Sequence, residues 1–286
     1  YDRKWRDKNK DEAPKDVKIT IYTKQKKIPF PTINNFEDIK KLNPDYFVVA
    51  LPTPKHFTFL KFIESNFSNK KVLIEKPLFE KFRNIRLNKN KYWVGYNLRF
   101  HPLINFLKKK KLRPININIW CSSYLPFWRK NINYKYSNSA DKKGGGVLLE
   151  LSHEIDYLHW LFGEFKILFS LNKKISKLKI KSNDLLIACL RSNKYNCIVN
   201  INLNFFSRNL RRGMSIDTNA ESYYVDLIKN KIEIFNGDKK KVIKYKNFKI
   251  NKTYYDQHLS IINDKTKHNC TFTEGLKLLN FLKKIS

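Results

Sequence analysis

The sequence predicts an α/β fold in which a parallel sheet with flanking helices is followed by a second, α+β domain. Strand-like runs alternate with helix-like stretches over residues 17–97, which is typical of a parallel sheet. From residue 185 onward, short strand-like runs follow one another with turn signals between them, which is typical of antiparallel strands. We therefore expect domains at 1–97 and 98–286, with the last helix returning to the first domain.

The first domain shows the two hydrophobic periods clearly. Val17, Ile19 and Ile21 alternate with polar residues, the period of a strand, and Asn35 is a plausible N-cap for the next helix. The continuous apolar run at 46–51 predicts a buried parallel strand. The expected elements are strands at 17–22, 46–51, 72–74 and 92–94, with helices at 36–42 and 57–63 and another helix between the last two strands.

The second domain begins with a helix at 103–107 and a strand at 115–119, followed by a loop over 121–143 that is rich in aromatic residues. Three glycines then precede an amphipathic helix over 147–162, which Gly163 ends. The dipeptide Asn236-Gly237 predicts a hairpin. The remaining expected elements are strands at 185–190, 197–203, 214–216, 223–227, 232–235 and 242–245 and helices at 254–262 and 274–285.

Composition excludes several classes of protein. The 286 residues are 42% hydrophobic, which is globular composition. The sequence has no run of about 18 apolar residues that could span a membrane. The four cysteines show neither C-x-x-C spacing nor a nearby histidine pair, so we expect no metal site. Scattered thiols of this kind favour a reducing, cytoplasmic setting.

The net charge is the most unusual feature of the composition. The chain carries 58 basic and 25 acidic residues, a formal charge of +33. Such a charge suggests a polyanionic partner, and a basic nucleic-acid-binding protein is one possible interpretation. The lysines are spread nearly evenly, however, and the sequence has no motif of a nucleic-acid-binding module. We therefore expect no specific nucleic-acid partner.

Three segments carry residues suited to chemistry. Glu75-Lys76-Pro77 and Thr53-Pro54-Lys55-His56 each follow a buried strand, at the edge where open α/β sheets place ligand contacts. In the third segment, Glu150, His153 and Asp156 recur at three-residue spacing on the expected helix and would share one face. A carboxylate one turn before an imidazole can orient a general base. The alternative is a solvated acidic face with a satisfied histidine.

Together these segments resemble the glucose–fructose oxidoreductase, inositol dehydrogenase and MocA (Gfo/Idh/MocA) family. The similarity rests on T-P-K-H at 53–56, E-K-P at 75–77, G-Y-N-L-R-F-H-P at 95–102 and G-G-G…H-E-I-D at 144–156, in matching order over residues 17–286. It implies an N-terminal dinucleotide-binding domain and a C-terminal domain with a large, mostly antiparallel sheet that forms homodimers or homotetramers.

The resemblance also implies an activity and the residues that perform it. The expected activity is hydride transfer between NAD or NADP and a secondary alcohol or ketone of a sugar, a sugar derivative or a cyclitol. Lys76, His153 and Glu150 would be catalytic. The cofactor would be lined by Thr53, Pro54, His56, Glu75 and Lys76.

The sequence departs from the family pattern at two points. Glu150 stands three residues before His153, whereas the family has an aspartate four before it, which puts the role of Glu150 in doubt. No G-x-G-x-x-G occurs in the chain, so we infer that the first strand and phosphate-binding turn are missing from it. The alternative is a redox-inactive sugar-binding or regulatory relative. Thr23 and Lys24, at the end of the expected strand, would suit a 2′-phosphate and favour NADP over NAD.

The aromatic loop is the best candidate for substrate contacts. Tyr124, Trp128 and Tyr136 could stack on sugar rings, and Arg129 could hold a carboxylate or phosphate. We place Arg99, as a second anion contact, and Asp156 at the same substrate, and we expect an acidic or nucleotide-linked sugar. The alternative is that the loop is a dimer contact or a lid.

Overall fold

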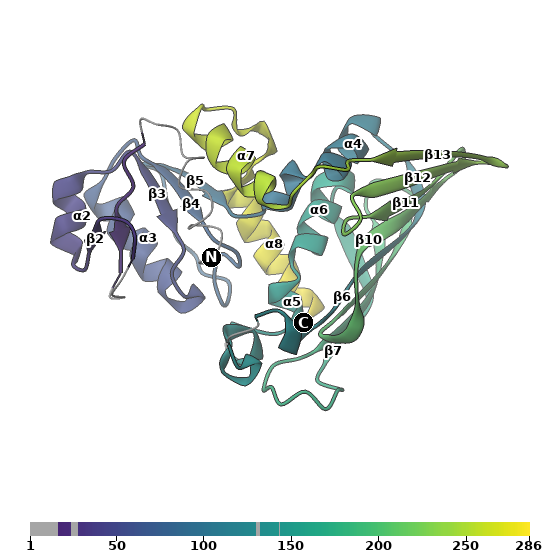
Figure 1. The fold of residues 1–286 in the computed structure, drawn as a ribbon, viewed down its shortest axis with the longest axis horizontal. Helices are drawn as coiled ribbons and strands as arrows, with labels where there is room; N and C mark the ends of the chain where they lie inside the picture. The colour runs from purple at the N-terminus through teal and green to yellow at the C-terminus, as the bar shows by residue number, and fades with distance from the viewer. Residues whose placement is uncertain (1–16, 24–27, 130–131, 143) are drawn as a thin grey trace.

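The computed structural model describes residues 17–23, 28–129, 132–142 and 144–286. Two sheets lie on opposite sides of a layer of helices (Figure 1). The smaller sheet has the order β14-β5-β4-β3. Its strands β3 (Tyr46–Val49), β4 (Lys71–Ile74) and β5 (Lys91–Val94) are parallel, and β14 (Cys270–Thr271) pairs antiparallel with β5. The predicted parallel sheet is therefore confirmed.

The helices beside this sheet also follow the sequence pattern. Helix α2 (Phe36–Leu42) begins at Asn35, whose side-chain oxygen accepts a 2.8 Å hydrogen bond from the Asp38 amide, so the predicted N-cap is confirmed. Helix α3 (His56–Asn66) connects β3 to β4. The expected strand at 17–22 is shorter, because only β1 (Ile21–Tyr22) pairs, with the parallel β2 (Thr32–Ile33).

The prediction of a helix between β4 and β5 is wrong. Residues 77–90 contain no helix, and the chain instead crosses in an irregular conformation. The carboxylate of Glu64 on α3 accepts hydrogen bonds from the amides of Asn88 and Lys89 at 2.7 and 2.8 Å. A side chain thus satisfies backbone groups that a helix would have paired internally.

The larger sheet has eight strands in the order β13-β12-β11-β10-β6-β9-β8-β7. It is antiparallel except for the parallel pair of β6 and β9. Its strands are β6 (Pro114–Tyr124), β7 (Phe165–Lys173), β8 (Leu185–Ser192), β9 (Ile198–Asn204), β10 (Phe206–Thr218), β11 (Ser222–Asp226), β12 (Lys231–Asn236) and β13 (Lys239–Lys244). The hairpin predicted at Asn236-Gly237 joins β12 to β13.

Edge strand β7 has no counterpart in the predicted elements. Its side chains do not alternate between buried and exposed positions, because Leu168 and Phe169 are both exposed. A strand at the edge of a sheet can thus lack the period that a half-buried strand shows in the sequence. The antiparallel character of the second sheet is nevertheless confirmed.

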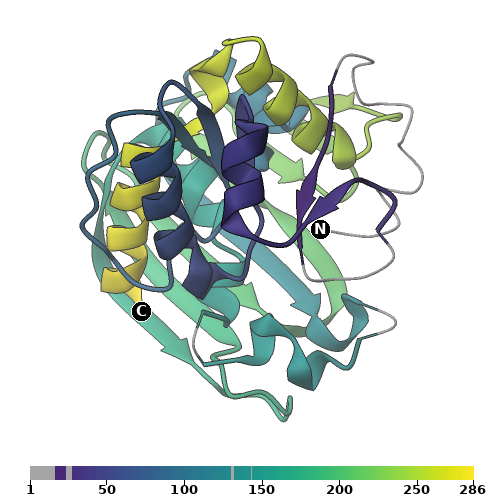
Figure 2. The ribbon, with the colours of Figure 1, turned by 90° about the vertical axis from the view of Figure 1, so that its left-hand side faces the viewer.

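Helices fill the space between the two sheets. Helices α4 (Pro102–Lys110), α5 (Val147–Glu150) and α6 (His153–Phe162) cover one face of the large sheet, and α7 (Asn251–Ile262) lies near the end of the small one (Figures 1 and 2). Helix α8 (Phe272–Ile285) lies between the two sheets. At Gly275 a Cβ atom would stand 2.5 Å from Val94 on β5, so only glycine allows this close approach. No helix of the described residues is long and apolar enough to cross a membrane.

Candidate active site

The chain breaks between α5 and α6, where the sequence predicted one continuous helix. Helix α5 ends at Glu150, and α6 begins at His153. Between them, Ser152 donates a 2.9 Å hydrogen bond to the carbonyl of Leu149. The prediction that Glu150, His153 and Asp156 share one face of a single helix is therefore wrong. The break instead places Glu150 and His153 at two helix ends that meet at one junction.

Lys76 joins this junction to the small sheet. It follows β4, at the carboxyl edge that the sequence indicated, and its ammonium donates a 2.7 Å hydrogen bond to the backbone carbonyl of Glu150. The Glu150 carboxylate lies 3.6 Å from the same nitrogen and accepts a 2.9 Å hydrogen bond from the Ser139 hydroxyl. The ammonium of Lys76 is therefore oriented by both the main chain and the side chain of Glu150.

His153 is buried at the start of α6, with 8% of its surface exposed. The edge of its ring meets that of Tyr96, with the centroids 5.5 Å apart. Its Nδ1 atom is buried and has no hydrogen-bond partner among the described residues. Burial lowers the pKa of His153 well below its usual value, and the positive charges of Lys76 and Arg212 lower it further. The imidazole is thus neutral near pH 7 and has a nitrogen able to accept a proton.

The residues expected around the cofactor lie after the strands of the small sheet. Thr53 and Pro54 belong to a short 3-10 helix (Thr53–Lys55) that follows β3. Glu75 directly follows β4, and burial raises the pKa of its carboxyl group. His56 is 1% exposed, and its two ring nitrogens lie 2.8 and 3.0 Å from the carbonyl oxygens of Leu51 and Leu78. This histidine therefore ties the loops after β3 and β4 together.

The two remaining residues expected at the cofactor follow β1. Thr23 comes directly after this strand, and its amide donates a 2.9 Å hydrogen bond to the carbonyl of Ile33. Lys24 lies outside the described residues.

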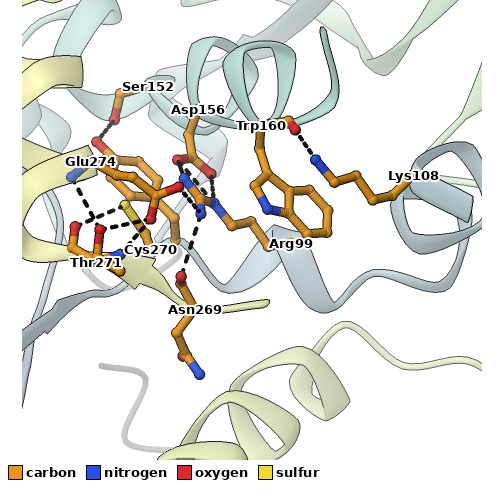
Figure 3. Close-up of polar contacts among 10 residues, drawn as sticks. Arg99, Lys108, Ser152, Asp156, Trp160, Asn269, Cys270, Thr271 and Glu274 are labelled. Carbon is orange, nitrogen blue, oxygen red and sulfur yellow. Dashed lines mark hydrogen bonds and ion pairs between the residues drawn. The ribbon is translucent and has the colours of Figure 1, made fainter. Parts of the chain in front are cut away.

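Arg99 and Asp156 form a buried ion pair, although the sequence analysis placed both at the substrate. The guanidinium Nε and Nη2 atoms donate to the Asp156 carboxylate at 3.0 and 2.7 Å (Figure 3). Its Nη1 donates to the carboxylate of Glu274 at 3.1 Å and to the carbonyl of Asn269 at 3.5 Å. The side chains of Arg99 and Asp156 are only 4% and 2% exposed. Their charges are used to hold α6 against α8, so we do not retain them as substrate contacts.

The aromatic residues expected at the substrate lie at the surface. The strand β6 extends to Tyr124, so the loop begins later than expected. Arg129 is exposed, Tyr136 is 86% exposed, and the indole of Trp128 donates a 3.0 Å hydrogen bond to Ser123. None of the hydrogen bonds or ion pairs found among the described residues links this loop to Lys76 or His153.

Two functional candidates on β10 were missed in the sequence. Arg208 stacks on Tyr124, with the guanidinium carbon 4.6 Å from the ring centroid, and Arg212 lies near His153. The available signal was the segment Ser207–Arg212, where three arginines occur in a chain whose basic residues are otherwise mostly lysine. Within the described part of the chain, no three His, Cys, Asp or Glu residues are placed to hold a metal ion.

Solved structures similar to this chain in fold include dehydrogenases. A levoglucosan dehydrogenase in complex with NADH and levoglucosan is 15% identical, covers 90% of this chain and 82% of its own, and superposes with a TM-score of 0.76. A UDP-N-acetylglucosamine 3-dehydrogenase from Acidithiobacillus ferrooxidans is 15% identical over 90% of this chain and 81% of its own, with a TM-score of 0.70. These similarities establish the fold.

The family is established by sequence. Residues 120–279 match the model of the oxidoreductase family C-terminal alpha/beta domain, and the chain belongs to this Gfo/Idh/MocA family. An uncharacterised oxidoreductase of Synechocystis is 28% identical over 141 residues, which are 46% of this chain and 38% of that protein. The chain thus aligns with less than half the length of this curated relative. The resemblance deduced from the four motifs is confirmed.

Proposed function

We propose that this protein is an NAD(P)-dependent dehydrogenase that acts on a secondary alcohol or ketone of a sugar or sugar derivative. One observation carries the proposal: an oriented lysine ammonium and a neutral, buried histidine with an unpartnered nitrogen lie together at the carboxyl edge of a parallel sheet. Ligands of open α/β sheets bind at this edge. The family assignment and the dehydrogenases of the same fold support the same activity.

The described residues fit one part of a nicotinamide cofactor. The loops after β3 and β4 present Thr53, Pro54 and Lys76 at the sheet edge, and the neutral imidazole of His153 lies near Lys76. No glycine occurs before Gly95, so the sequence offers no glycine-rich turn for the pyrophosphate. Thr53, Pro54 and Lys76 would therefore contact the nicotinamide end of the cofactor. The side chains of Thr23 and Lys24 would set a preference for NADP.

Lys76 and His153 have distinct roles in the proposed reaction. A bound nicotinamide supplies the hydride acceptor or donor. The neutral imidazole of His153 takes the hydroxyl proton of the substrate during oxidation and returns it during reduction. The ammonium of Lys76 donates a hydrogen bond to the same oxygen and stabilises its developing negative charge. Glu150 holds Lys76 in this orientation through its carbonyl and its carboxylate.

Binding and turnover test the proposal separately. NADPH and NADH are titrated against this chain and against a version extended at its N-terminus by a glycine-rich βα segment, with energy transfer from the tryptophans as the signal. We expect the extended version to bind a dinucleotide and to turn over a member of a panel of neutral and acidic sugars. Lys76→Met and His153→Gln should each lower kcat at least about a hundredfold while dinucleotide binding persists.

Three results would contradict the proposal. Full turnover in either variant would remove the assigned roles. Failure of the extended version to bind either dinucleotide would favour the redox-inactive relative. Dinucleotide binding without turnover of any sugar would leave the cofactor in place but remove the sugar as the substrate class.

A further inference from the structure

A second buried ion pair lies directly beside His153. The Nε and Nη2 atoms of Arg212 on β10 donate to the two carboxylate oxygens of Glu154 at 2.6 and 3.1 Å. Glu154 is the residue after His153, and its side chain is fully buried, while that of Arg212 is 23% exposed. Paired, parallel hydrogen bonds of this kind fix both the position and the orientation of the two groups.

This pair connects the start of α6 to the large sheet. Arg212 stands opposite Cys121 of β6 in the sheet register. From the other side, Lys76 reaches the end of α5 from the small sheet. His153 therefore lies between two anchors, one from each sheet, at the point where the two helices meet. Any movement of β10 relative to α6 would displace the imidazole.

The charges around His153 come from several elements. Lys76 follows β4 and Glu150 ends α5. Glu154 lies in the first turn of α6, and Arg212 lies on β10. The ring of Tyr96 meets the imidazole edge-on. Of these groups, the cations of Lys76 and Arg212 both lower the pKa of His153, in addition to the effect of burial. Arg212 thus acts on the imidazole although it makes no hydrogen bond to it.

We propose that Arg212, held in place by Glu154, is a positioning residue for His153: it anchors the start of α6 to the large sheet and holds a positive charge beside the imidazole. This inference rests on the proposed function of His153. Removing either partner of this pair would leave the other charge uncompensated, so each group stabilises the other in its position. The pair therefore sets both where the proton acceptor lies and how readily it becomes charged.

The test is an NMR titration of the histidine side chains in the whole chain, without cofactor or substrate. The chain has six histidines, and the signal of His153 is identified by its loss in His153→Gln. Arg212→Gln should raise the titration midpoint of His153 by about one pH unit, because a cation is removed. Arg212→Lys keeps the charge and should leave the midpoint near that of the wild type. His159 is the internal control, because burial and the charge of Arg99, and not Arg212, lower its pKa.

Two results would overturn the proposal. One is an identical titration of His153 in Arg212→Gln and in the wild type. The other is an equal upward shift in Arg212→Lys and Arg212→Gln, which would show that geometry and not charge is responsible. If Arg212→Gln does not fold, Glu154→Gln provides the second test: it removes the anion that offsets the charge of Arg212 and should lower the midpoint of His153, and an unchanged midpoint there would equally reject the idea.

The titration requires no turnover. A shift of the expected sign in a chain without dehydrogenase activity would therefore contradict the proposed function alone. In an active enzyme, Arg212→Gln should also move the acidic limb of the kcat/KM profile toward higher pH. A purely structural loss would lower kcat/KM at every pH without moving this limb.

Discussion

Helix α6 carries two buried arginine–carboxylate pairs, and they have different surroundings. Arg99 donates to Asp156, Glu274 and the carbonyl of Asn269, so two carboxylates and a carbonyl share its charge. Within the described part of the chain, the guanidinium of Arg212 is hydrogen-bonded to Glu154 alone, and it lies near His153, whose Nδ1 has no partner. The first pair is satisfied and joins helices, whereas the second also acts on a residue of the candidate active site. Burial and pairing alone therefore do not separate structural charges from functional ones.

The largest expected effect is on stability and concerns the first pair. Asp156→Asn leaves the guanidinium of Arg99 buried with reduced compensation and should lower the free energy of unfolding by about 3 kcal/mol. Urea unfolding followed by tryptophan fluorescence measures this. Glu274→Gln is the matched control, because the side chain of Glu274 is 43% exposed and its loss should cost less than about 1 kcal/mol. Equal losses in the two variants would contradict the distinction between a buried and a peripheral partner.

The second prediction concerns acid stability. Burial lowers the pKa of His101, His159 and His258 to about 4 from the ordinary value of 6.5. Between these values the unfolded chain binds more protons than the folded one. The contribution of these neutral histidines to the free energy of unfolding is therefore fully present above about pH 6.5 and is lost as the pH falls toward about 4.

Urea unfolding at about pH 7.5 and about pH 5.5 measures this loss. Each histidine should cost about 1 kcal/mol at the lower pH. His159→Phe should reduce the difference between the two conditions, because His159 packs between the rings of Phe165 and Phe281 and its Nε2 has no partner within the described residues. An unchanged difference would show that His159 takes up protons in the folded chain as it does in the unfolded one.

The smallest expected effect concerns a charge outside both pairs. Arg129 is exposed and was predicted to hold an acidic group of the substrate. Arg129→Ala should raise KM several-fold for an acidic sugar and leave KM for a neutral sugar unchanged, with stability within about 0.5 kcal/mol of the wild type. Arg208→Ala is the comparison, because Arg208 is held over Tyr124. Equal effects of Arg129→Ala on both kinds of sugar would reject an anionic substrate contact at this position.

The sequence by itself determined the α/β fold class, the parallel sheet, most of the antiparallel strands and the family. Hydrophobic periodicity and short motifs report local conformation, so the runs at 46–51 and 72–74 and the residues around Lys76 could be recognised. The prediction of a helix before β5 was wrong; there Glu64 on α3 accepts hydrogen bonds from the amides of Asn88 and Lys89, and no local pattern records such a partner. Edge strand β7 was missed because its register shifts between Ile167 and Phe169, and Leu168 and Phe169 are both exposed, so the strand has no alternation to read.

Only the tertiary structure decided which charges are paired. Arg99 and Asp156 stand 57 positions apart in the chain, as Arg212 and Glu154 nearly do, and nothing local marks either pair. The break after Glu150 is likewise held by Lys76 from the other sheet and by Ser139 from the preceding loop. A motif fixes the identity of a side chain, but its partners are chosen by the packing of distant elements, and those partners set its burial, orientation and proton affinity.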